Sequence, residues 1–138
     1  MKLSPLVLVG LLVLMQAVPY GRAHTNPPVV TEPVWDSATT RELAVRTCCS
    51  CHSNETTWPW YSNVAPFSWL VQSDVDGGRA ELNFSEWSSN RPLRNATQTV
   101  GEGEMPPWFY LPLHPEARLS AAETEELAAG LAAMAAGR

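Results

Sequence analysis

The sequence has no run of basic residues and an excess of acidic ones. Its 138 residues include nine Lys and Arg against fourteen Asp and Glu, which gives a formal net charge of −5. This balance argues against nucleic acid and against an anionic lipid surface as partners. An acidic surface instead favours a protein partner with a basic docking face.

The sequence also has too few cysteines for a disulfide framework. There are three, an odd number, and all of them lie between residues 48 and 51. At least one thiol therefore stays unpaired, and disulfides do not organise this fold. The three cysteines need a local chemical explanation.

No apolar run is long enough to be an ordinary membrane-spanning helix. The longest runs from Leu3 to Val18, about 16 residues, whereas roughly 20 are needed. It follows Lys2 and precedes small residues at Gly21 and Ala23, a pattern typical of a secretory signal cleaved after Ala23. We therefore expect residues 1–23 to direct export to the periplasm. The alternative is an uncleaved anchor on the outer side of the cytoplasmic membrane, the only case in which we expect membrane contact.

Proline and tryptophan, by contrast, are abundant, with twelve and six residues. So many prolines indicate short helices joined by long loops, and the tryptophans indicate an aromatic core or the lining of a flat cofactor. Residues 24–35 contain three prolines and are predicted to form an extended arm. Residues 36–138 have the length of a single domain.

The stretch Cys48-Cys49-Ser50-Cys51-His52 carries the strongest chemical signal. It reads as Cys-x-x-Cys-His, the attachment pattern for a c-type haem. Thiols at i and i+3 lie on one side of a helical turn, so Cys48 and Cys51 can both bond to the vinyl groups of one porphyrin. His52 can then supply the proximal imidazole to the iron. The pattern predicts one covalently bound haem c.

Two other readings of the cysteine pair are weaker. A zinc site needs two further ligands, and only Cys49, His24 and His114 are candidates. A redox dithiol of the thioredoxin type needs a βαβ context that the sequence lacks. Because an export signal also agrees with c-type haem, we favour the haem interpretation.

The second axial position of the iron has several candidates. Met105 lies in a loop, residues 101–107, whose glycines permit close approach to a flat cofactor and whose prolines stiffen it. A His/Met pair is typical of electron carriers, so Met105 is the favoured distal ligand. His114, Met134 or an open position are the alternatives. An open position would indicate a haem-based sensor or a peroxidase-like domain.

The helix signals predict an all-α fold. Ser or Thr followed three residues later by Glu predicts helix starts near Thr39 and Ser120. The first helix would end with the cysteine motif, another would begin at Pro66 and end at Gly77-Gly78, and 83–87 would form a turn and short helix. The C-terminal helix has a core-facing stripe: Leu127, Leu131 and Met134.

Further side chains are candidates to support the haem. A loop proline carbonyl, Pro59 or Pro66, could accept a hydrogen bond from the second nitrogen of His52. Arginines bind carboxylates through two hydrogen bonds, so three could pair with the propionates: Arg79, Arg91 and Arg94. Aromatic residues of the following loop could pack on the porphyrin edge: Trp58, Trp60 and Tyr61.

The stretch CHSNETTWPWYSNVAPFSWLVQSDVDGGRAELNFSEW resembles the haem-binding domain family of small exported monohaem c-type cytochromes. The resemblance runs from about Asp36 to Leu127, with further landmarks at 103–108 (GEMPPW) and 113–117 (LHPEA). It implies a small cytochrome c-like domain with covalent haem. Cys49 departs from the family pattern, and it could compete with its neighbours during haem attachment. We therefore predict single-electron transfer in the cell envelope by a non-enzymatic haem protein with an unknown redox partner.

Overall fold

The computed structural model describes residues 4–87 and 93–137, apart from the side chain of Arg94. Within these residues the regular structure is helical, and the single β contact is an isolated bridge between Thr31 and Glu86. The expected all-α class is confirmed. The α-helices are α1 Pro5–Met15, α2 Ala38–Thr47, α3 Cys49–His52, α4 Phe67–Glu81, α5 Leu93–Gly101 and α6 Ala121–Ala136, with 3-10 turns η1 Trp60–Asn63 and η2 Pro115–Ala117.

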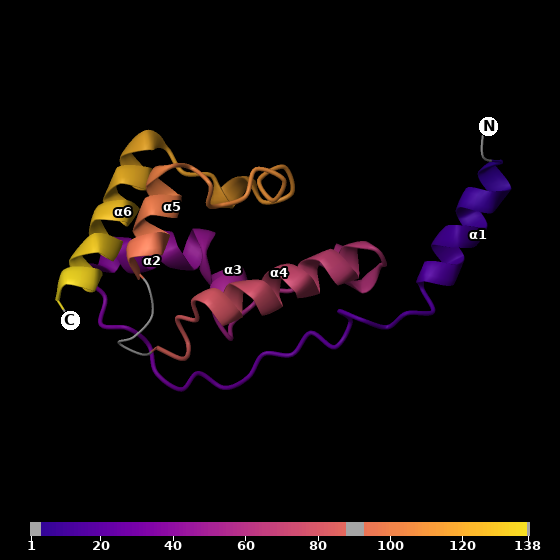
Figure 1. Ribbon diagram of the computed structural model, residues 1–138, viewed down its shortest axis with the longest axis horizontal. Coiled ribbons are helices and arrows are strands. Elements are labelled where there is room, and N and C mark those ends of the chain that lie inside the picture. The colour runs from indigo at the N-terminus through magenta and orange to yellow at the C-terminus, as the bar shows by residue number, and fades with distance from the viewer. Residues whose placement is uncertain (1–3, 88–92, 138) are drawn as a thin grey trace.

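The hydrophobic core lies where α2, α5 and α6 meet. Helices α5 and α6 lie side by side, and α2 packs against α6 (Figure 1). Helices α5 and α6 contribute apolar side chains at helical spacing to one buried cluster, and α2 adds two adjacent residues. The expected stripe of α6 belongs to this cluster, so Met134 is a core residue. The helical members are Leu43, Ala44, Leu93, Val100, Leu127, Leu131 and Met134.

Capping decides where two of these helices begin. The side chain of Ser37 accepts a hydrogen bond from the Thr40 amide at 3.0 Å, so α2 starts at Ala38. The expected helix start near Thr39 is confirmed, but the N-cap is Ser37, and the expected capping box at Thr39 was wrong. Ser37 has the extended backbone that an N-cap needs. Its hydroxyl oxygen can therefore accept from an amide of the first helical turn that has no partner within the helix. In α6 the expected capping box between Ser120 and Glu123 is confirmed.

Helix α4 does not end at its two glycines, as the sequence had suggested. It continues to Glu81, and Gly78 is buried where α4 crosses α3. A Cβ at Gly78 would lie 2.6 Å from the carbonyl oxygen of Cys51. Position 78 requires glycine because the backbones of α3 and α4 approach too closely there to leave space for a side chain. The glycine does not end the helix.

The arm at residues 24–35 is extended and runs beneath α3 and α4 toward α2 (Figure 1). It pairs with the turn after α4, since the amides of Val30 and Thr31 both donate to the carbonyl of Ser85 at 2.8 and 3.1 Å. The short helix expected at 83–87 is absent from this described stretch, because its backbone groups bond to the arm instead. The arm thus serves as a partner for an otherwise irregular segment.

Helix α1 projects away from the remainder of the molecule (Figure 1). Its residues from Pro5 to Leu14 are all exposed. Among the helices that the structure describes, none has both the length and the apolar character needed to cross a membrane.

Candidate functional site

The cysteine motif occupies a short helical turn of its own. Helix α2 ends at Thr47, Cys48 forms the junction, and α3 begins at Cys49. The amide of His52 donates to the carbonyl of Cys48 at 2.8 Å, which holds the turn closed. The sequence had predicted one helix ending in the motif; the structure instead divides it at Cys48 into α2 and α3.

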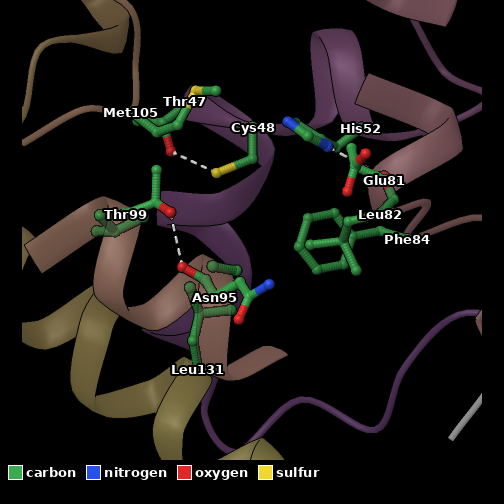
Figure 2. A pocket seen from close by; sticks show the side chains of 12 residues that line it. Thr47, Cys48, His52, Glu81, Leu82, Phe84, Asn95, Thr99, Met105 and Leu131 are labelled. Atoms are coloured by element: carbon green, nitrogen blue, oxygen red, sulfur yellow. Dashed lines mark hydrogen bonds between the residues drawn. The ribbon is translucent and has the colours of Figure 1, made fainter. Parts of the chain in front are cut away.

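Three of the predicted site residues line one cavity of about 210 Å³: Cys48, His52 and Met105 (Figure 2). Its walls come from several elements, including Leu82 and Phe84 after α4, Val100 of α5 and Leu131 of α6. Most of this lining is apolar, so the cavity offers a water-poor environment beside an imidazole and a thioether. The tertiary fold therefore brings Met105 and His52 together from positions 53 apart in the chain.

The imidazole of His52 is oriented by a backbone carbonyl. Its Nδ1 lies 3.0 Å from the carbonyl oxygen of Leu82, so Nδ1 carries the proton and donates while Nε2 keeps the lone pair. The prediction that the carbonyl of Pro59 or Pro66 accepts this hydrogen bond was wrong. Leu82 follows the end of α4 with an extended backbone, which places its carbonyl outside the helix and available to His52.

A second cavity, about 370 Å³, adjoins the same helical turn. It is lined by Cys51, Tyr61, Tyr110 and His114, together with apolar residues of α4 and of the loop after Met105. The structure therefore separates the two motif cysteines, because Cys48 lines the first cavity and Cys51 the second. Burial raises the pKa of Tyr110 to about 12, so this phenol stays neutral.

His114, the alternative distal ligand, lies in this second cavity. Its Nε2 is 2.7 Å from the hydroxyl of Tyr61 and its Nδ1 is 2.9 Å from a carboxylate oxygen of Glu116. Its ring also stacks on Tyr110 with centroids 3.9 Å apart. Both ring nitrogens are thus engaged by protein groups, outside the cavity that contains His52.

The surroundings of the partly buried thiols favour the neutral thiol over the thiolate. Burial raises the pKa of Cys48, and burial with the nearby charge of Asp74 raises the pKa of Cys51 to about 11. Reactive dithiols have lowered pKa values, so these surroundings argue against the redox reading. For the zinc reading, the described parts of the chain contain no group of three His, Cys, Asp or Glu side chains placed to hold a metal ion.

Cys49 faces a different part of the protein from its neighbours. It lines a small hollow with Trp35, Arg41 and Phe84, and it packs against the hydrophobic core. Burial raises the pKa of its thiol to about 12. Cys49 is therefore a packing residue by its surroundings, and it lies in neither of the two larger cavities.

Most of the residues that were predicted to contact the haem make other contacts or are exposed. The Arg79 guanidinium donates to the carbonyls of Ser53 and Thr25, so it fastens the arm. Trp58 stacks on His24, and Trp60 is 80% exposed. Of the three loop aromatics, only Tyr61 lines either cavity. Two predictions lie outside the described residues: Arg91 and the side chain of Arg94.

Two contributors to the site were missed from the sequence. The carbonyl of Leu82 has no sequence signal, because every residue has one and its position depends on where α4 ends. Gly78 did have a signal, since a glycine inside a helical pattern often marks close packing. We had interpreted that glycine as a helix end.

No curated protein and no solved structure matches this chain. A family model described as a haem-binding domain matches residues 10–133, which is most of the 138 residues. The matched range contains the helical turn of the motif, both cavities and the loop with Met105. The chain therefore belongs to the haem-binding domain family.

Proposed function

We propose that the chain binds one haem covalently and carries single electrons in the cell envelope. Cys48 and Cys51 would form the two thioether bonds, with His52 as the proximal and Met105 as the distal ligand. The family assignment supports haem binding. The covalent attachment, the ligand pair and the redox role are our inference from the residues of the site.

The observation that carries this proposal is the hydrogen bond from His52 Nδ1 to the Leu82 carbonyl, beside a cavity shared with Met105 and Cys48. A histidine that binds a metal almost always donates its other ring N–H to such an acceptor. That bond leaves Nε2 as the nitrogen with a lone pair. The donor set of imidazole, thioether and thiol therefore fits a c-type haem.

The remaining residues of the site position the ligands and exclude water. Leu82 keeps the His52 ring from rotating, and Leu131 and Val100 form an apolar wall around the cavity. When bound, the haem supplies an iron that takes up and releases one electron. Two axial side chains held in place would limit rearrangement, and a thioether ligand in an apolar pocket favours the reduced state.

The two cavities constrain how the cofactor is held. Because Cys48 lines one cavity and Cys51 the other, a cofactor joined to both thiols has to reach both. The side chains around Cys51, including Tyr61 and Tyr110, would then face the cofactor as well. The acidic net charge of −5 supports a redox partner with a basic docking face.

An optical spectrum of the mature protein tests the proposal. The protein, produced in a bacterial host with c-type maturation, should retain haem on a denaturing gel because thioether bonds survive denaturation. Oxidised protein should be low-spin, with the weak charge-transfer band of methionine-ligated iron, and Met105→Ala should remove that band. Met134→Leu, a change in the core, is the control and should keep it. A high-spin wild type with rapid carbon monoxide binding would indicate an open distal position instead.

A further inference from the structure

Helix α1 is apolar on every side. Its eleven residues, PLVLVGLLVLM, include no charged or hydrogen-bonding side chain, and Pro5 to Leu14 are all exposed. A surface helix of a soluble protein has one polar face, whereas a helix that is apolar all round is surrounded by apolar material. A partner with a single docking face would leave much of α1 exposed to water. Lipid hydrocarbon surrounds a helix completely.

The residue after α1 is fastened to the haem-binding domain by a two-way amide contact. The side chain of Gln16 donates to the carbonyl of Ala65 at 2.9 Å, and its oxygen accepts from the Ala65 amide at 3.0 Å. Arg22 donates to the same oxygen at 2.9 Å. One side chain thus satisfies both backbone groups of Ala65, just before α4 begins, and these bonds join positions 49 apart.

Gly21 adds a close backbone contact to this attachment. It is buried and has φ +80°, and a Cβ there would overlap the carbonyl of Ser68 and lie 3.0 Å from the Cβ of Gln72. Only glycine meets both requirements. The hydroxyl of Tyr20 donates to Asp76 at 3.2 Å, one turn further along α4. The chain from Gln16 to Arg22 therefore lies along α4 as part of the folded domain.

These contacts bear on the cleavage predicted after Ala23. A signal peptidase would remove Gln16, Gly21 and Arg22, and all the contacts described above would be lost. The family match also begins at residue 10, so the shared domain includes a segment that a cleaved protein would lack. Both observations favour a segment that remains attached.

We propose that residues 1–23 are retained and that α1 is held in the hydrocarbon of a lipid bilayer, with Gln16–Arg22 fixing the domain to it. Eleven helical residues extend roughly 16 Å, about half of a hydrocarbon core of roughly 30 Å. The attraction is hydrophobic and needs no anionic lipid, which agrees with the acidic chain. This inference does not depend on haem, since it rests on contacts outside both cavities.

The mature full-length protein tests the inference through its mass and its location. After expression in a bacterium with an export pathway, intact mass should include residues before Gln16. The protein should sediment with membranes, stay there in high salt and be released by detergent. A soluble protein beginning at His24 would overturn the proposal. A retained segment in a soluble oligomer would also overturn it, because second copies would then cover α1. The same measurements on haem-free protein keep this result separate from haem attachment.

A pair of glycine variants tests the attachment to α4. Gly21→Ala places a methyl group against Ser68, whereas Gly10→Ala meets nothing within 4 Å. In detergent-solubilised protein, trypsin should cut after Arg22 several-fold faster in Gly21→Ala than in wild type, with Gly10→Ala unchanged. Gln16→Ala should give the same increase without a steric clash. Equal cutting rates in wild type, Gly21→Ala and Gln16→Ala would show that the segment is not fastened.

Discussion

Neighbouring residues of the motif have unlike surroundings. His52 lies beside a cavity with its Nδ1 bonded to Leu82, while Cys49, three positions earlier, packs against Trp35 and the core. Cys48 forms the junction between two helices and Cys49 begins the second, so proximity in sequence does not give the residues of the motif a common role. Cys49, the thiol that departs from the family pattern, lines neither of the two larger cavities.

Replacing Cys49 should therefore leave haem attachment intact. Cys49→Ala should retain wild-type haem stoichiometry on a denaturing gel and lower the free energy of unfolding by about 1 kcal/mol, the loss of a small packing group. Cys48→Ala and Cys51→Ala are the matched comparisons. Each should lose one thioether bond, measured as a shifted reduced spectrum and weaker haem retention. Reduced haem content in Cys49→Ala would contradict its assignment as a packing residue.

At the scale of elements, the position of α3 depends on how closely α4 approaches it. Gly78 lies against the Cys51 carbonyl, while Gly77 next to it has open space where a Cβ would be. The same helix then ends at Glu81 and releases the Leu82 carbonyl to His52. Helix α4 thus supplies both the contact that positions the motif and the group that orients its histidine.

The two adjacent glycines should respond to substitution in opposite directions. Gly78→Ala should lower the free energy of unfolding by about 1–3 kcal/mol, because the added methyl group forces α3 and α4 apart. Gly77→Ala should raise it by about 0.5–1 kcal/mol, since alanine favours the helix. Urea denaturation measures both. Haem incorporation should fall only in Gly78→Ala, and an equal response of both variants would refute the packing role.

A surface network joins the start of α6 to α2. Glu123 accepts from the Ser120 amide at 2.8 Å and pairs with Arg46 of α2 at 2.6 Å. The pKa of Glu123 is lowered from 4.5 to about 2, mainly by the hydrogen bond from the Ser120 amide and next by the hydrogen bond from Arg46. The charged carboxylate is therefore favoured by the folded state.

This lowered pKa predicts an acid-dependent loss of stability. A carboxyl group whose pKa is lower in the folded state stabilises fully above its ordinary value and loses that effect as pH falls through the folded value. The contribution of Glu123 should thus be complete above pH 4.5 and disappear toward about pH 2. Thermal unfolding should show a Tm difference between wild type and Glu123→Gln that shrinks over this range. A difference independent of pH would contradict the assignment.

For the molecule as a whole, the chain between Gln16 and Thr31 packs along the helical domain. Its attachments extend from Gln16 on Ala65 to Thr31 beside Ser85. Arg79 lies at the middle of this path. Its guanidinium donates four hydrogen bonds of 2.8–3.1 Å, to acceptors on both the arm and the loop after α3: Ser53 O, Thr25 O, Asn26 Oδ1 and Thr56 Oγ1.

Arg79→Met should loosen the arm without altering the haem spectrum. The variant should lose about 1–3 kcal/mol in the free energy of unfolding, as expected for hydrogen bonds to a charged group, and the arm should become more sensitive to protease. Arg118→Met, at an exposed arginine, serves as the control and should change neither. A shifted haem spectrum or reduction potential in Arg79→Met would support the propionate role predicted from sequence instead.

Local patterns determined much of this protein without reference to its fold. The Cys-x-x-Cys-His spacing, the capping box at Ser120 and the stripe Leu127, Leu131 and Met134 each depend on residues within one or two helical turns. Such short-range patterns are readable because helix geometry alone relates their members. The all-α class followed from them, whereas the haem-binding family was recognised from a much longer stretch of resemblance; the structure and the family match agree with both.

Tertiary structure alone decided the contacts between distant segments. It placed the Leu82 carbonyl on His52 across 30 positions and the Ala65 backbone on Gln16 across 49. It also directed Cys48 and Cys51 to different cavities and made Gly78 a contact point. Backbone carbonyls and close approaches carry no residue-specific pattern, because any residue has a carbonyl and only folding determines which one comes near.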